Sequence, residues 1–163
     1  MKKPIPLVNR DTFPLPNLGS TLRQEAKILQ SGRGFIVLRG LDPDRYSREE
    51  NIIIYTGVSS YIGSLRGRQD SNLIHGLRKS SMMNHIKDLS RTDEAHKIGA
   101  PAYTTDHQVF HTDSGDIVSL YCLSPAAEGG ESKLASSWRV YNEIAKTRPD
   151  LIKVLAEPWV LDG

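Results

Sequence analysis

The chain has 163 residues, of which 38% are hydrophobic and 25% charged, and its formal net charge is +2. These values are typical of a globular protein and exclude disordered and fibrous classes, while the small, scattered positive charge does not indicate a nucleic-acid-binding surface. No stretch approaches the roughly 18 apolar residues of a membrane helix, and a single cysteine excludes a disulfide framework, so a cytoplasmic, non-membrane protein is expected.

The first part of the chain is expected to contain one helix and one buried strand. Residues 1–19 hold four of the nine prolines and are predicted to form an irregular lead-in. Apolar residues at helical spacing over residues 20–31 predict a helix, with Ser20 as its N-cap and Gly32 as its stop. The compact apolar run at residues 34–41 predicts a short buried strand.

A second helix is predicted directly after Ser47. Ser47 and Glu50 have the spacing of a capping box, in which each satisfies a backbone N–H of the other. Apolar and small residues that include Gly57 and Tyr61 recur on one face of this helix. A polar, glycine-containing loop follows, and it leads to a short strand predicted around residues 83–86.

Two strands and two helices are predicted for the remainder. Residues 108–112 and 116–123 should form strands joined as a hairpin by the turn "DSGD". "EGGES" is a second turn, Ser136 or Ser137 should cap the next helix, and Pro149 suits the first turn of the last one. This irregular succession predicts a mixed, largely antiparallel α+β architecture rather than a doubly wound parallel sheet.

The tripeptide His111-Thr112-Asp113 is the best candidate site. On a strand, His111 and Asp113 project to the same side, which gives an imidazole and a carboxylate at a fixed separation. Fe(II) sites built from two histidines and one carboxylate use this arrangement. The alternative is a polar strand end, at which His111 donates a hydrogen bond to Asp113. The apolar residues before His111 and the tight turn after Asp113 favour a site at the mouth of a buried strand.

The other histidines and the cysteine are weaker candidates. His107 could serve as a second-layer or substrate-pocket residue if the strand extends back to it. His75, His85 and His96 lie in polar surroundings and are expected to be solvated. Cys122 falls inside an apolar run, which predicts a small buried side chain rather than a nucleophile.

The stretch "QVFHTDSGDIVSLYCLSPAAEGGESKLASSWRVYNEIAKTRPDLI" resembles the TauD/TfdA-like branch of the Fe(II)- and 2-oxoglutarate-dependent dioxygenases, and its fungal members most of all. The family pattern is H-x-D, an apolar strand, a G-G-x-[TS] turn, a helix and then a "PDL" helix. "GRGFIVLRGLDP" and the helix after it also resemble the family, so the likeness covers nearly the whole chain.

The resemblance implies a fold, two cofactors and site residues. The fold would be a partial double-stranded β-helix, a clavaminate synthase-like jelly roll with flanking helices, formed by residues 1–163 as a single domain without its C-terminal strands. His111 and Asp113 match the first two iron ligands. Ser132 matches the hydroxyl that binds a carboxylate of 2-oxoglutarate, although many relatives have threonine there. The implied cofactors are Fe(II) and 2-oxoglutarate, and the implied reaction is hydroxylation of a small organic molecule.

The sequence also departs from the family pattern. The distal histidine and the arginine that grips 2-oxoglutarate belong to a C-terminal half, and no histidine follows His111 here. Two functions therefore stay open: a dioxygenase, or a truncated and catalytically incompetent relative that acts as a binding module or has no function. A third possibility is a site completed by a second chain. The sequence specifies neither the substrate nor the oligomeric state.

Overall fold

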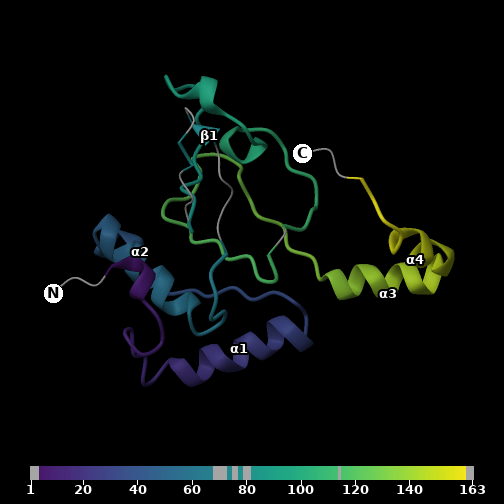
Figure 1. Ribbon diagram of the computed structural model, residues 1–163, viewed down its shortest axis with the longest axis horizontal. Coiled ribbons are helices and arrows are strands. Elements are labelled where there is room, and N and C mark those ends of the chain that lie inside the picture. The colour runs from purple at the N-terminus through teal and green to yellow at the C-terminus, as the bar shows by residue number, and fades with distance from the viewer. Residues whose placement is uncertain (1–3, 68–72, 75–76, 79–81, 114, 161–163) are drawn as a thin grey trace. The chain divides into compact units, whose positions relative to one another are not determined.

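The computed structural model describes most of the chain, namely residues 4–67, 73–74, 77–78, 82–113 and 115–160. The chain divides into two compact units, one formed by Met1–Ile62 with Glu131–Gly163 and the other by Gly63–Gly130. The first unit contains the four α-helices of the described residues, and the second contains short elements joined by irregular backbone (Figure 1).

The first helix, α1 (Gly19–Ser31), follows a lead-in that includes the short 3-10 helix η1 (Ile5–Leu7). Its apolar face is buried through Leu22, which is only 1% exposed, as the helical spacing of apolar residues predicts. The expected stop at Gly32 is confirmed, because Gly32 is the C-cap.

The expected N-cap of α1 is wrong. Leu18, not Ser20, occupies the cap position, and it makes no side-chain hydrogen bond there. The reason is local: Leu18 already has helical dihedral angles, and the Gly19 amide donates to the Leu15 carbonyl at 2.8 Å. The helix therefore grows out of a preceding turn and does not begin at a side-chain cap.

The second helix, α2 (Arg48–Ser59), has the predicted capping box. The Ser47 hydroxyl accepts from the Glu50 amide at 3.3 Å, and the Glu50 carboxylate accepts from the Ser47 amide at 2.8 Å. Just before α2, the 3-10 helix η2 (Pro43–Arg45) is held by Asn51, whose side-chain amide donates to the Pro43 carbonyl at 2.9 Å. Asn51 is buried, so this bond satisfies a polar group that burial would otherwise penalise.

The lead-in packs against the end of α2. The buried apolar side chains of the described residues are Val8, Leu22 and Tyr61. The Tyr61 hydroxyl accepts from the Leu15 amide at 2.8 Å and donates to the Phe13 carbonyl at 3.1 Å. This small core joins residues almost fifty positions apart, so the irregular lead-in has a defined place on the helices.

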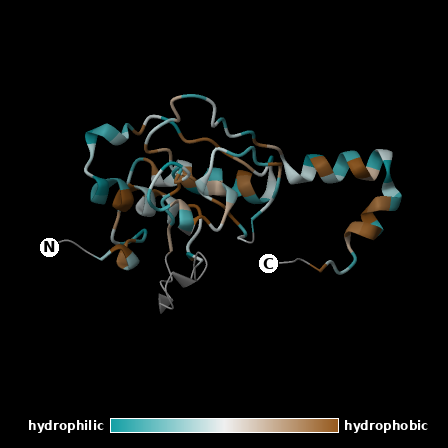
Figure 2. Cartoon of the chain, turned by 90° about the horizontal axis from the view of Figure 1, so that it is seen from above, coloured by the Kyte–Doolittle hydropathy of each residue, from teal (hydrophilic) through white to brown (hydrophobic). Residues whose placement is uncertain are grey.

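Two further helices, α3 (Ser137–Thr147) and α4 (Pro149–Leu155), form a helical hairpin. Ser136 is the N-cap of α3, and Pro149 begins α4, as predicted. Hydrophobic residues recur along both helices (Figure 2). Much of this apolar surface stays exposed, since Trp138 is 57% and Leu155 56% exposed.

The second unit has little regular structure among its described residues. Two strands of two residues, β1 (Leu73–Ile74) and β2 (Leu77–Arg78), pair antiparallel. Two 3-10 helices follow, η3 (Ala95–Lys97) and η4 (Pro101–Tyr103). The Leu89 amide donates to the Tyr103 carbonyl at 2.9 Å, so the two ends of residues 89–103 lie next to each other.

The predicted strands are wrong. Irregular backbone is found at residues 34–41, 83–86, 108–112 and 116–123. The predicted hairpin turn includes Ser114, which lies outside the described residues. A partial jelly roll is therefore not confirmed by the described part of the structure.

The physical reason is the lack of ladder partners. A strand is stabilised by hydrogen bonds and side-chain pairs with a neighbouring strand, and an isolated apolar run has neither. The apolar side chains of the predicted strands are also not buried, since Val37 is 66% and Leu120 70% exposed. Cys122 is also exposed, contrary to the expectation of a buried side chain.

None of the described helices is long and apolar enough to cross a membrane.

Candidate functional site

The segment that carries the predicted metal ligands is exposed. His107, His111 and Asp113 all lie on irregular backbone of the second unit, and each is solvent-exposed. Val109 and Phe110, the apolar neighbours of His111, are 73% and 70% exposed. The expectation that they place the site at the mouth of a buried strand is therefore wrong for this structure.

The hydrogen bonding of His111 fixes its tautomer. The ring nitrogen Nδ1 lies 2.7 Å from the Val109 carbonyl oxygen. A carbonyl oxygen only accepts hydrogen bonds, so Nδ1 must carry a proton in this contact. In the neutral imidazole, Nε2 then has a free lone pair, which is the form in which histidine binds a metal. A backbone carbonyl bound to the other ring nitrogen is also the usual support of metal-ligating histidines.

The polar alternative considered for the tripeptide has His111 donating a hydrogen bond to Asp113. That hydrogen bond is not formed, and Nδ1 contacts the backbone two residues earlier instead. Within the described residues, Asp113 forms no hydrogen bond or ion pair. None of the described residues therefore competes with a ligand for its carboxylate.

The predicted residues do not converge into a complete site. Within the described ranges, no group of three histidine, cysteine, aspartate or glutamate side chains is placed to hold a metal ion. His85 and His96 are exposed, in keeping with the prediction that they are solvated. His75 lies outside the described residues.

Ser132 is the last residue of the predicted "EGGES" turn. Gly129 and Gly130 have φ angles of 65° and 74°, a left-handed conformation that favours glycine. A Cβ at Gly130 would also lie only 2.9 Å from the Ala126 Cβ. Both facts explain why this turn uses two glycines. Ser132 itself is exposed on irregular backbone that leads into α3, in the first unit.

An Fe(II) site of two histidines and one carboxylate needs three protein donors. The imidazole of His111, with Nε2 left for a metal, and the carboxylate of Asp113 are donors of the right types. Their number is two, and the described residues supply no third. The residues therefore fit part of such a site.

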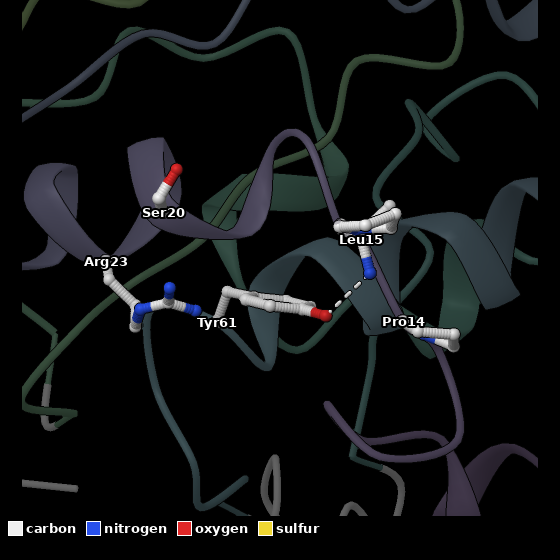
Figure 3. Close-up of a pocket in the computed structure, with 6 residues that line it drawn as sticks. Pro14, Leu15, Ser20, Arg23 and Tyr61 are labelled. Carbon is white, nitrogen blue, oxygen red and sulfur yellow. Dashed lines mark hydrogen bonds between the residues drawn. The ribbon is translucent and has the colours of Figure 1, made fainter.

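A pocket that sequence reasoning missed lies in the first unit. It has a volume of about 400 Å³ and is lined by Pro14, Leu15, Pro16, Ser20, Arg23 and Tyr61 (Figure 3). From sequence, Ser20 is expected only as a helix cap and Tyr61 only on an apolar helix face. The sequence feature that could have indicated this pocket is the Pro-Leu-Pro run at residues 14–16, because two prolines with fixed φ angles form a stiff segment of backbone.

Comparison with known proteins gives a family and two curated relatives. Residues 2–162 match the model of the "Taurine catabolism dioxygenase TauD, TfdA family". The chain is 45% identical over 158 residues to the taurine hydroxylase-like protein SAT17 of Stachybotrys chartarum, which covers 94% of this chain and 39% of that protein. It is 26% identical over 147 residues to the FR-33289 synthase of Streptomyces rubellomurinus, which covers 89% and 40% respectively.

The chain thus spans about two fifths of the length of both curated relatives. No solved structure gives a significant match to it.

Proposed function

Since the chain belongs to the taurine catabolism dioxygenase TauD/TfdA family, we propose that it provides one part of an Fe(II)- and 2-oxoglutarate-dependent dioxygenase that hydroxylates a small organic molecule. The chain would form the N-terminal part of one TauD/TfdA-like domain, whose jelly-roll strands pair only when their partners are present. The name of its relative SAT17, a taurine hydroxylase-like protein, supports hydroxylation as the reaction type.

In this proposal His111 and Asp113 are two of the three iron ligands. The observation that carries it is the contact from Nδ1 of His111 to the Val109 carbonyl, which leaves Nε2 for a metal. The carboxylate of Asp113, two residues later, supplies the second donor. When bound, iron would bring the oxygen chemistry, while these side chains would hold it in place.

Ser132 and His107 have supporting roles in the proposal. The exposed Ser132 hydroxyl, which follows the two left-handed glycines, would donate to a carboxylate of 2-oxoglutarate. His107 would line the substrate pocket. The single cysteine, which excludes a disulfide framework, supports a reducing, cytoplasmic location.

Metal binding is the direct test of this proposal. Co(II) serves as an optical probe in place of Fe(II), and its dissociation constant is measured by absorption titration of the purified chain. His111→Ala should weaken Co(II) binding by about tenfold or more, because even outer contacts of metal sites change affinity by that much. His96→Ala is the matched control, since His96 is also exposed and should not affect the metal.

Turnover is the second measurement. With Fe(II), ascorbate and 2-oxoglutarate, the chain should release succinate above the level of the His111→Ala variant. Co(II) binding that is equal in the wild type and His111→Ala would overturn the ligand assignment. Absence of both succinate and metal binding tighter than micromolar would instead indicate the second function, a truncated and catalytically incompetent relative that acts as a binding module or has no function. The absence of a third ligand among the described residues is the observation that favours this second function.

A further inference from the structure

The pocket between the lead-in and α1 combines apolar walls with the guanidinium of Arg23. Pro14, Leu15 and Pro16 belong to its lining, and the ring of Tyr61 lies between Arg23 and Leu15 (Figure 3). Its volume of about 400 Å³ falls within the range of small-molecule sites. All of its lining residues belong to the first unit.

The pocket is held in shape by hydrogen bonds that do not depend on a ligand. The hydroxyl of Tyr61 accepts from the Leu15 amide at 2.8 Å and donates to the Phe13 carbonyl at 3.1 Å. The side chain of Tyr61 is only 6% exposed, so the ring and the Pro-Leu-Pro run are fixed relative to each other. A pre-formed wall lowers the entropic cost of binding.

Arg23 is the charged group of the pocket. Within the described residues, Arg23 forms no ion pair and no hydrogen bond. Its guanidinium points toward Tyr61 (Figure 3). A Cβ at Gly19 would lie 3.4 Å from Nη1 of Arg23 and 2.7 Å from Cε1 of Tyr61. Glycine at this position therefore leaves room for both side chains.

We propose that this pocket binds a small organic carboxylate with an apolar body. The planar guanidinium of Arg23 offers paired N–H donors that match a carboxylate, and the Ser20 hydroxyl adds a further polar group at the rim. The proline, leucine and tyrosine surfaces take the apolar body. One cation among apolar walls favours a monoanion over neutral or cationic molecules. This binding involves none of the proposed metal ligands and goes beyond the proposed function.

Benzoate is the probe, and benzamide is its neutral counterpart of the same shape. Binding to the full chain is followed by chemical-shift changes of the Leu15 and Ser20 amides, in EDTA and without 2-oxoglutarate, so the result is independent of any metal. Arg23→Gln removes the guanidinium. Lys27→Gln removes the same charge from the next turn of α1 and does not line the pocket, so it is the matched control.

Benzoate should bind the wild type and Lys27→Gln saturably and with similar dissociation constants. Arg23→Gln should bind benzoate at least about tenfold more weakly than the wild type, because that is the usual loss when a charged hydrogen-bonding partner is removed. The wild-type affinity should also fall as salt is added, because Arg23 is exposed. The proposal is overturned if the wild type gives no saturable shift, if Arg23→Gln and Lys27→Gln bind alike, or if benzamide binds as well as benzoate.

Discussion

Gly57 lies in α2 at the point where the lead-in packs against the helix, and replacing it with alanine tests that packing directly. Gly57 is buried, and an added Cβ would overlap the ring of Phe13, with Cε1 only 2.7 Å away and Cγ and Cδ1 closer still. The Phe13 backbone cannot retreat freely, because its carbonyl accepts the Tyr61 hydroxyl and its amide donates to the Asn9 carbonyl at 2.8 Å.

Two opposing terms decide the result of Gly57→Ala. Alanine is favoured over glycine inside a helix by about 1 kcal/mol. Inserting a carbon into an occupied space costs about 1–3 kcal/mol, because the ring must leave its position. The steric term is the larger at so short a distance, so we expect a net loss of about 1 kcal/mol in the free energy of unfolding.

Urea unfolding followed by far-ultraviolet circular dichroism measures this loss as a lower midpoint. The same substitution in a Phe13→Ala background is the decisive control. With the ring gone, only helix propensity remains, so Gly57→Ala should there raise the free energy of unfolding by about 1 kcal/mol. A stabilising effect in the wild type, or the same destabilisation in both backgrounds, would refute the packing of Phe13 on α2.

Three further predictions concern single interactions. Tyr61→Phe should lower the free energy of unfolding by about 1–3 kcal/mol, because two backbone groups of the lead-in lose their buried partner. Ser47→Ala should cost about 1 kcal/mol by removing half of the capping box, as measured by urea unfolding. The hydrogen bond from Arg148 lowers the pKa of Asp150, so the Asp150 carboxyl should titrate at a higher pH in Arg148→Gln, as measured by carbon NMR.

The lowered pKa of Asp150 also makes the stability of the folded chain depend on pH. Because the pKa of Asp150 is lowered in the folded chain, its contribution to stability is present above the ordinary aspartate pKa and is lost as the pH falls through the lowered value. The pair is exposed, so salt should weaken it. Ser47→Thr keeps a capping hydroxyl and should largely preserve stability. An unchanged titration of Asp150 in Arg148→Gln, or equal midpoints for Ser47→Ala and the wild type, would contradict these assignments.

The helices were predictable from the sequence because their determinants are local. A capping box needs only Ser47 and Glu50 three residues apart, a helix stop needs only Gly32, and an apolar face needs only a repeat of three to four residues. Each of these features depends on residues within a turn or two of one another. The family was also recognisable, because its pattern is an order of short motifs along the chain.

The strands and the completeness of the site were not predictable in this way. Residues 108–112 and 116–123 have the composition of strands, but a strand forms only when a partner from elsewhere satisfies its backbone, and the described residues supply none. The sequence by itself thus determined the helices, the family and the donor types of His111 and Asp113. Only the tertiary structure decided which apolar runs are buried, which group Nδ1 of His111 contacts, and that Tyr61 and Arg23 line one pocket with the Pro-Leu-Pro run. Each depends on contacts between groups that sequence patterns do not specify.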